Sequence, residues 1–342
     1  MRKLASIQTI LDIQPIPDAD KIEVATVQGW KIVIRKGEFK VGDPCVYFEI
    51  DSLIPRAPWN DFLADRLSEK KDQKAPIRLR TIKLRKQISQ GLVMPLNILP
   101  MDIGEIEEGQ DLTEILNIEK YEVPIPACLS GQVRGDLPGI VPITDETRIQ
   151  SYPALIQEFQ GEEVYWTIKI DGTSGTFVNI GGDHHVCSRK LSLLETEGNT
   201  YWKMYHKYGL KEILNAAGDI AIQGEVAGPS IQKNKLGLKD HELFVFNVLD
   251  LHDRKYFNYA NLVEFCKTYN LQMVPVAKVE VFNIQSVDEI VQLATEVRYP
   301  NGRLGEGYVI RPVVERYSKA LSGRASFKVI NNKYLLDDGG GK

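Results

Sequence analysis

The feature that most constrains the fold of this 342-residue chain is a change of pattern near its middle. Residues 121–144 carry four prolines and three glycines, a composition that interrupts regular helices and strands. Before this segment, short stretches rich in Val, Ile and aromatic residues alternate with glycines; after it, helical and strand patterns are mixed. The sequence therefore predicts a domain at 1–120, a linker at 121–144 and a second domain at 145–342, together an α+β protein.

The first domain is expected to consist of strands. Stretches 21–37, 43–55 and 76–96 are rich in β-branched and aromatic residues, and glycines at turn positions punctuate them. Several short strands at this spacing favour a small closed barrel of the OB type. The periodicity alone does not separate this fold from another small β-barrel.

The second domain is expected to mix helices and strands. Helices are predicted at 145–159, with Asp145 as a possible N-cap, and at 199–218, ending near Gly218. Strands are predicted at 164–170 and 176–180, on either side of an Asp-Gly turn. Ser286 and Glu289 form a capping-box pattern before a further helix.

Composition excludes several classes of protein. Apolar residues make up 43% and charged residues 26%, which argues against a fully disordered chain. No apolar run approaches the length of a membrane span, and polar residues interrupt the start of the chain before a signal peptide could form. The four cysteines lie far apart, so we expect reduced thiols and an intracellular, most simply cytoplasmic, protein. A net charge of −4 does not exclude nucleic acid, because the distribution of charge matters more than its sum.

The first residue that indicates chemistry is Lys169, in the segment K-I-D-G at 169–172. It ends an apolar stretch just before a tight turn, where its amine can face a pocket. Neighbouring cations or burial can lower the pKa of a lysine and make it a nucleophile. Four residues form a weak motif, and alone they more often mark a surface lysine before a β-turn.

Further blocks follow Lys169 in an order that nucleotidyl transfer requires. A lysine attacks the α-phosphorus of a nucleotide, cations and a divalent metal neutralise the phosphates, carboxylates hold the metal, and an aromatic ring stacks on the base. The blocks that supply these groups are S-R-K at 188–190, Q-G-E at 223–225, F-V-F-N at 244–247, E-G-Y-V-I-R at 306–311 and S-F-K at 326–328.

This series resembles motifs I, Ia, III, IV and V of the covalent nucleotidyltransferases, the superfamily of ATP-dependent ligases and mRNA capping enzymes. The blocks span about 145–333, and E-G-Y-V-I-R-P, Q-G-E-V-A-G-P-S-I-Q and S-F-K-V-I-N-N-K-Y-L-L are similar to those of nick-sealing RNA ligases. The segment I-S-Q-G-L-V-M-P-L at 88–96 resembles the amino-terminal OB domain of the family-five RNA ligases. The resemblance implies an ATP-grasp-like nucleotidyltransferase domain with antiparallel sheets and flanking helices after the OB domain. DNA ligases and capping enzymes place their OB domain last, which argues against both.

The resemblance also implies roles for single residues. Lys169 corresponds to the lysine that becomes adenylylated, and Glu225 and Glu306 to the metal-linked carboxylates. Phe246 corresponds to the aromatic residue that stacks on adenine. The remaining residues implied to contact ATP or its phosphates are Arg148, Ile168, Gly172, Arg189 and Lys328.

Two positions depart from the family pattern. Motif V usually carries two lysines in K-x-K, but position 326 is Ser here, which leaves only Lys328. Lys319 and Lys333 are the candidates for the missing charge. Position 168 is Ile where many ligases have Glu for the adenine amine, so base selectivity would depend on backbone groups and Phe246.

A basic stretch at 77–86 is the candidate surface for nucleic acid. It contains five cations and no acidic residue: Arg78, Arg80, Lys83, Arg85 and Lys86. Strand periodicity predicts that Arg78 and Arg80 share one face and that Lys83 and Arg85 share another. The stretch is either a charged edge strand protected from aggregation or a groove that follows a phosphate backbone.

Together these observations predict an ATP-dependent RNA ligase that joins 3′-OH and 5′-phosphate ends through lysyl-AMP and an AMP-capped 5′-phosphate, in RNA repair. We expect Mg²⁺ or Mn²⁺ as the metal and RNA as the partner. We expect a monomer and no association with a membrane. The alternatives are a DNA ligase with the same mechanism, a GTP-using capping-type enzyme and a non-catalytic nucleic-acid-binding relative. Intact Lys169, Glu225, Glu306 and Lys328 speak against the last.

Overall fold

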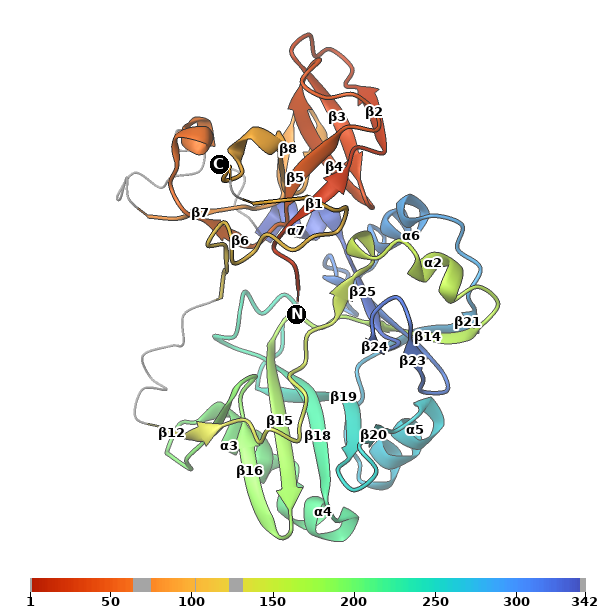
Figure 1. Ribbon diagram of the computed structural model, residues 1–342. Coiled ribbons are helices and arrows are strands. Elements are labelled where there is room, and N and C mark those ends of the chain that lie inside the picture. The colour runs from red at the N-terminus through yellow and green to blue at the C-terminus, as the bar shows by residue number, and fades with distance from the viewer. Residues whose placement is uncertain (1, 64–74, 102, 123–131, 339–342) are drawn as a thin grey trace. The chain divides into compact units, whose positions relative to one another are not determined.

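The computed structural model of the protein describes residues 2–63, 75–101, 103–122 and 132–338. They divide into two compact units (Figure 1). The first comprises residues 1–124 with 335–342, and the second comprises residues 125–334. No helix in these described ranges has both the length and the apolar content to cross a membrane.

The first unit is built from short strands, as its composition predicts. Its elements are β1 (Ala5–Thr9), β2 (Asp12–Pro15), β3 (Ile22–Val27), β4 (Trp30–Arg35), β5 (Pro44–Phe48), β6 (Ser52–Ile54), β7 (Ile77–Arg78), β8 (Ile82–Leu84), β9 (Gln87–Ser89), β10 (Leu92–Met94), β11 (Glu119–Lys120) and the 3₁₀ turns Pro58–Asn60 and Leu96–Ile98. Strands β3 and β4 form the hairpin expected within 21–37, paired from Ile22 with Arg35 to Val27 with Trp30.

The strands of the first unit form four small sheets, with the orders β1-β5-β10, β11-β6-β7, β2-β3-β4 and β8-β9. A single hydrogen bond from Gln90 N–H, which follows β9, to Lys31 O on β4 links two of them. Trp30, Tyr47 and Phe48 are among the fully buried side chains. The predicted continuous closed barrel is therefore not seen among the described residues, because irregular segments interrupt the ladders between sheets.

The second unit contains two larger sheets and their helices. Its strands are β12 (Val133–Asp136), β13 (Thr147–Arg148), β14 (Glu163–Ile168), β15 (Thr173–Ile180), β16 (Asp183–Cys187), β17 (Leu191–Leu193), β18 (Ile220–Ala227), β19 (Glu242–Asp250), β20 (Lys255–Tyr256), β21 (Val276–Val281), β22 (Gly307–Pro312), β23 (Tyr317–Ser318), β24 (Gly323–Arg324) and β25 (Phe327–Ile330). Its helices are α2 (Leu155–Glu158), α3 (Thr200–Lys207), α4 (Leu210–Ala217), α5 (Tyr259–Thr268) and α6 (Val287–Ala294), with a 3₁₀ turn at Ile149–Ser151. A last helix, α7 (Asn332–Asp338), begins in this unit and ends in the first.

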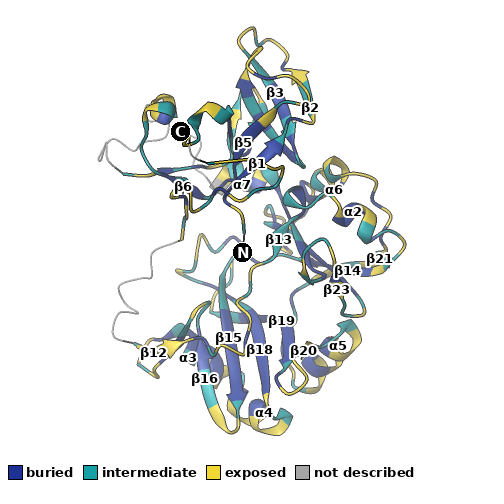
Figure 2. Cartoon of the chain, viewed as in Figure 1, coloured by how far each residue is buried: buried dark blue, intermediate teal, exposed yellow. Residues whose placement is uncertain are grey.

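The larger sheet has seven antiparallel strands in the order β12-β17-β16-β15-β18-β19-β20. Helices α3 and α4 contact β16 and β15, and α5 contacts β19. The apolar faces of the helices and the sheet enclose a core that includes Phe177, Met204, Leu214 and Phe265. In Figure 2 the central strands β15 and β18 are largely buried along their length. This sheet is a rigid support for residues at the strand ends.

The second sheet has five strands in the order β13-β25-β22-β14-β21. Its core includes Phe159, Trp166, Phe282 and Phe327, and α6 contacts β25. Strand β13 runs parallel to β25, and the other pairs are antiparallel. The expectation of purely antiparallel sheets is wrong at this edge, where β13 arrives through the preceding connector rather than by a hairpin.

Three predicted elements differ in the structure. Residues 133–136 of the expected linker form β12, which pairs with β17, so this part of the segment belongs to the sheet; residues 123–131, with Cys128, lie outside the described ranges. The helix predicted at 145–159 is only the single turn α2, because Pro153 interrupts the pattern. The helix predicted at 199–218 is two helices, divided where Gly209 adopts a φ of 60°.

Other local predictions agree with the structure. The Ser286 side chain accepts a hydrogen bond from the N–H of Glu289 at the start of α6, as the capping pattern predicts. Cys45, Cys187 and Cys266 are buried free thiols, and burial raises the pKa of each to about 12.

Candidate active site

Lys169 lies where the two sheets of the second unit are connected. It follows β14, and residues 169–172 lead directly into β15 of the larger sheet. Its backbone N–H donates to Gly307 O at 2.9 Å, because β14 and β22 are paired up to Ile168 and Tyr308. Glu306 precedes β22, so this pairing brings its carboxylate to the nucleophile candidate. The Lys169 Nζ atom lies 2.8 Å from Glu306 Oε2.

Glu225 reaches the same place from β18. The backbone at Gly172 runs against β18 so closely that a Cβ atom there would lie 2.4 Å from Val226 O and 2.8 Å from the Glu225 side chain. Gly172 is therefore required for the close approach of the two strands, which brings Glu225 near Lys169. The prediction that Gly172 contacts the nucleotide itself stays a prediction.

The charges of these side chains perturb one another. Burial lowers the pKa of Lys169, but the carboxylates of Glu306, Glu225 and Asp171 outweigh that effect and hold the pKa above its usual value. Burial raises the pKa of Glu225 to about 7; Lys169 opposes this shift, whereas Glu306 and Asp171 add to it. The site therefore concentrates negative charge around a protonated lysine.

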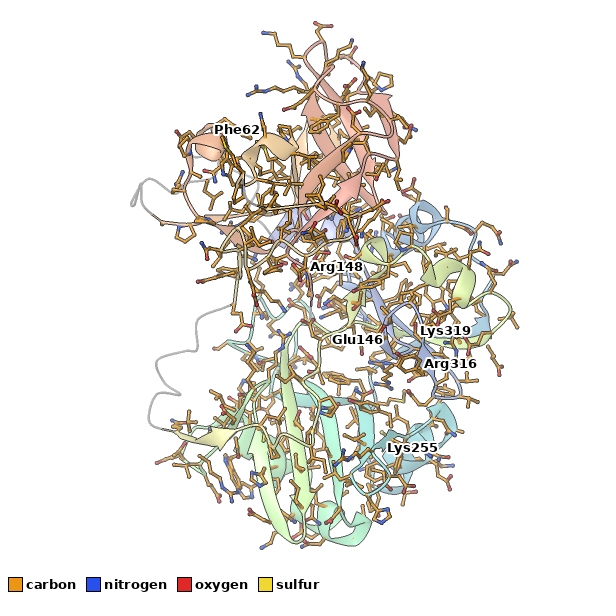
Figure 3. All side chains as sticks on the ribbon, in the orientation of Figure 1. Phe62, Glu146, Arg148, Lys255, Arg316 and Lys319 are labelled. Atoms are coloured by element: carbon orange, nitrogen blue, oxygen red, sulfur yellow. The ribbon has the colours of Figure 1, made fainter. Side chains whose placement is uncertain are left out.

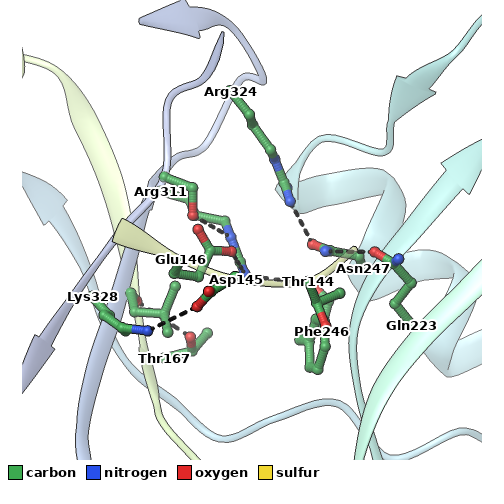
Figure 4. Close-up of polar contacts among 12 residues, drawn as sticks. Thr144, Asp145, Glu146, Thr167, Gln223, Phe246, Asn247, Arg311, Arg324 and Lys328 are labelled. Carbon is green, nitrogen blue, oxygen red and sulfur yellow. Dashed lines mark hydrogen bonds and ion pairs between the residues drawn. The ribbon is translucent and has the colours of Figure 1, made fainter. Parts of the chain in front are cut away.

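Three further cations predicted from the sequence are held near Lys169 by strand pairing and by Asp145. Lys328 pairs with Val309 on β22 and with Arg148 on β13. The Asp145 carboxylate accepts from Lys328 Nζ at 3.2 Å (Figure 4). The same carboxylate lies 2.9 Å from the Arg189 guanidinium. Burial lowers the pKa of Lys328 to about 8; Asp145 opposes the shift, and Arg148 and Lys169 add to it. The sequence pattern indicates Asp145 only as a helix cap, and no helix begins there.

Phe246 occupies a bulge in β19. Gln223 pairs with Asn247 and Gly224 pairs with Val245, which leaves Phe246 without a partner residue in the ladder. A bulge of this kind redirects a side chain, and bulges are frequent beside active sites. Phe246 is partly exposed and packs in the same apolar cluster as Ile168, whereas Phe244 is buried core. Phe246 and Ile168, the two residues predicted to lie against the base, thus share one apolar surface.

A buried ion pair lies under the Phe246 bulge. The Arg311 guanidinium donates to Glu146 Oε1 at 2.8 Å, to Ser326 Oγ at 3.0 Å and to the Phe246 carbonyl at 3.4 Å (Figure 4). Figure 3 shows Glu146 and Arg148 as neighbours in the chain near this network. Arg311, Ser326 and Phe246 lie in blocks that the sequence analysis singled out, whereas no motif indicated Glu146.

Ser326, which replaces the first lysine of motif V, is buried and accepts from Arg311. The cation that contacts this serine is Arg311, and Glu146 balances its charge. Lys333, a candidate for the missing charge, instead pairs with Glu296 at 3.0 Å. Lys319 is exposed and lines a surface hollow with Glu158 and Arg316.

The basic stretch of the first unit is divided in the structure. Arg78 pairs with Asp51 at 2.8 Å and lies over the Tyr121 ring, so it stabilises its own unit. Arg80, Lys83, Arg85 and Lys86 are exposed. The expectation that Lys83 and Arg85 share a strand face is wrong. Leu84 pairs with Gln87, so Arg85 and Lys86 form the turn of the β8–β9 hairpin, with φ values of 46° and 67°.

A divalent metal fits the chemistry of the Lys169 site. The described residues contain no group of three or more His, Cys, Asp or Glu side chains arranged to hold a metal by themselves. Mg²⁺ rarely needs such a cage, because one or two carboxylates, water and substrate phosphates commonly complete its shell. Glu225 and Glu306 supply two mutually repelling carboxylates, and a cation between them would relieve that repulsion.

Comparison with known families divides the chain as the structure does. Residues 4–96 match the family described as OB-fold domain, and residues 162–330 match the family described as RNA ligase. No curated protein matches the chain by sequence.

Solved structures of an RNA ligase from Naegleria gruberi resemble the whole chain. A mutant with AMP and Mn is 34% identical, with a TM-score of 0.89 over 98% of this chain and all of that one. A mutant with ATP and Mn is 33% identical, with a TM-score of 0.88 over 98% of this chain and 100% of that one. The ligase with PPi is 34% identical, with a TM-score of 0.88 over 98% of each chain. The protein therefore belongs to the RNA ligases, with an N-terminal OB-fold domain and a C-terminal RNA ligase domain.

Proposed function

We propose that this RNA ligase uses ATP and a divalent metal to join 3′-OH and 5′-phosphate ends at nicks in duplex RNA, in the manner of the family-five enzymes. The observation that carries the proposal is the convergence on Lys169 of Glu306 and Glu225, with Lys328 electrostatically coupled both to Lys169 and to Arg148. The similar Naegleria enzyme is found with ATP, AMP, PPi and Mn, which supports the same cofactors here.

In the first step the neutral Lys169 amine attacks the α-phosphorus of ATP. A nitrogen–phosphorus bond forms, the bond from the α-phosphorus to the pyrophosphate oxygen breaks, and the attacking nitrogen releases one proton and keeps the other in lysyl-AMP. Arg148, Arg189 and Lys328 would neutralise the phosphates, which is the main source of rate enhancement in phosphoryl transfer. Phe246 would stack on the adenine, and Ile168 would line the same apolar surface.

The metal would be held by Glu225 and Glu306. When bound, it would supply positive charge that offsets these carboxylates and neutralises substrate phosphates. Without that charge the same carboxylates favour protonated Lys169, which is not a nucleophile. The two glutamates therefore keep the lysine charged until a cation enters.

In the second step the 5′-phosphate of the RNA attacks the phosphorus of lysyl-AMP, and Lys169 leaves. In the third step the 3′-OH attacks the capped 5′-phosphate, a phosphodiester forms and AMP departs. The exposed cations Arg80, Lys83, Arg85 and Lys86 would follow the phosphate backbone of the strand that ends in the 3′-OH. Recognition of 2′-hydroxyls and A-form shape is how a protein distinguishes RNA in that strand.

The decisive experiment compares four nicked duplexes that carry RNA or DNA on the 3′-OH side and on the 5′-phosphate side. The proposal expects rapid sealing only when the 3′-OH strand ends in ribonucleotides. Equal sealing of an all-DNA nick would favour the DNA ligase alternative. Binding without sealing of any nick would favour a non-catalytic relative. A monomer and a cytoplasmic location remain predictions.

A further inference from the structure

Tyr299 is a buried side chain whose hydroxyl contacts three backbone groups of the active site. The hydroxyl donates to Lys169 O at 3.1 Å. It accepts from Asp171 N–H at 3.2 Å and from Glu306 N–H at 3.3 Å. One phenol therefore joins the segment that carries the nucleophile to the residue whose carboxylate lies against the lysine amine.

These three bonds use the full capacity of the hydroxyl group. A phenol has one proton to donate and two lone pairs to accept with. Its ring lies in an apolar cluster with Ile170, Phe244 and Tyr334. Burial raises the pKa of the phenol, so the hydroxyl stays protonated and keeps its donor at neutral pH.

The backbone around Tyr299 is fixed as well. Its N–H donates to Arg303 O at 2.9 Å, and its carbonyl accepts from Gly302 N–H at 2.8 Å. Gly305 N–H donates to Val297 O at 3.0 Å, which closes the turn just before Glu306. The phenol thus projects from a hydrogen-bonded turn and joins the Lys169 segment to Glu306.

We infer that Tyr299 is a positioning residue for the nucleophile, holding Lys169 and Glu306 in the geometry that lysine adenylylation needs. The inference rests on the proposed function, since it assigns a role within that reaction. The three hydrogen bonds of the Tyr299 hydroxyl are all with backbone groups, of Lys169, Asp171 and Glu306, and none is with a residue predicted to bind the phosphates. Its loss should therefore slow the attack and leave ATP binding largely intact. A displacement of about 1 Å at a reacting group can cost about 100-fold in rate.

Tyr165 provides a matched control. It is also a fully buried tyrosine, and it lies in β14, the strand that leads to Lys169. Its hydroxyl has no hydrogen-bond partner among the described residues. Tyr165→Phe therefore removes the same atom from another fully buried tyrosine of the second unit without breaking a hydrogen bond to the site.

The experiment measures single-turnover formation of lysyl-AMP with α-labelled ATP in the wild type, Tyr299→Phe and Tyr165→Phe. We expect Tyr299→Phe to lower the maximal rate about 10- to 100-fold, with half-saturation by ATP within about threefold of the wild type. Tyr165→Phe should keep both values within about twofold. A maximal rate for Tyr299→Phe within twofold of the wild type overturns the inference.

A second measurement is independent of the fraction of folded protein. The same preparations are given a pre-adenylylated RNA nick, whose sealing needs no attack by Lys169. The ratio of adenylylation rate to sealing rate should fall at least about tenfold in Tyr299→Phe. An unchanged ratio means that the substitution only destabilises the protein, and it overturns the inference. Absence of any adduct in the wild type would instead refute the proposed function, and the inference with it.

Discussion

The amine of Lys169 lies 2.8 Å from the Glu306 carboxylate, and the two residues are adjacent because β14 and β22 pair up to this point. This ion pair is the main favourable contribution that holds the pKa of Lys169 above its usual value, against the opposing effect of burial. The resting site therefore stores the nucleophile in its charged form, and the neutral form grows as the pH rises through that pKa.

Glu306→Gln should consequently lower the pKa of Lys169 in the absence of metal. The pH dependence of chemical modification of Lys169, followed by peptide mass spectrometry, reports this value. Glu296→Gln is the matched control, because it removes a similar carboxylate from the Glu296–Lys333 ion pair. A titration of Lys169 that is the same in the wild type and Glu306→Gln would show that the ion pair does not control protonation.

Metal binding should depend on pH through Glu225. Burial and the neighbouring carboxylates raise the pKa of Glu225 to about 7, and a protonated carboxyl group is a poor ligand. Affinity for Mn²⁺ should therefore increase between pH 6 and pH 8, with release of a proton. Calorimetry in buffers of different ionisation enthalpy measures both quantities.

Glu225→Gln should bind Mn²⁺ more weakly and with a flatter pH dependence. If the variant keeps the steep dependence of the wild type, another group controls the metal, and Glu225 is only a buried strand residue.

Asp145 should compete with the phosphates of ATP. Its carboxylate is already within 3.2 Å of Lys328 Nζ and 2.9 Å of Arg189, the cations that the phosphates need. Asp145→Asn removes the competing charge, so we expect the dissociation constant for ATP to decrease about two- to tenfold. Equilibrium binding to a Lys169→Met background measures the effect without turnover.

Asp240 offers a control of the same kind, because its carboxylate also bridges two cations, Lys203 and Lys207. Asp240→Asn should not alter ATP affinity. Weaker ATP binding by Asp145→Asn would mean that Asp145 orients the cations rather than competing for them.

The basic surface of the first unit should control the salt dependence of RNA binding. Arg80→Glu with Lys83→Glu should weaken binding and reduce the slope of log K against log salt by about one for each phosphate group that the variant no longer neutralises. Arg78→Gln is expected to lower the stability of the first unit, because Arg78 is paired with Asp51 and stacked on Tyr121. A salt slope unaffected by the double reversal would indicate a solvated edge strand.

Sequence patterns predicted the secondary-structure elements that depend on residues close together in the chain. The β3–β4 hairpin, the start of α6 at Ser286 and the strand before Lys169 all follow from residue alternation or capping. The series of sequence motifs from Lys169 to Lys328 also predicted that the candidate catalytic residues lie in one domain. All of them lie in the second unit. Pro153 and Gly209 mark the two helices that the patterns overestimated, since each interrupts a run of otherwise helical composition.

Contacts between distant segments could not be predicted in this way. Tyr299 lies 130 residues from Lys169 in the chain and carries no motif around it. Glu146 gains its role only because Arg311 is buried beside it, and Asp145 only because Arg189 and Lys328 meet there. The turn at Arg85 and Lys86 has none of the glycine or asparagine that normally marks a left-handed pair.

The measurement that tests the central claim most directly is incubation with α-labelled ATP and Mg²⁺, followed by denaturing electrophoresis and intact mass. We predict a labelled protein heavier by one AMP and no label in folded Lys169→Met. Label that persists in Lys169→Met would contradict the assignment of the nucleophile. Absence of label in wild-type protein that carried no AMP beforehand would contradict the proposed lysyl-AMP mechanism as a whole.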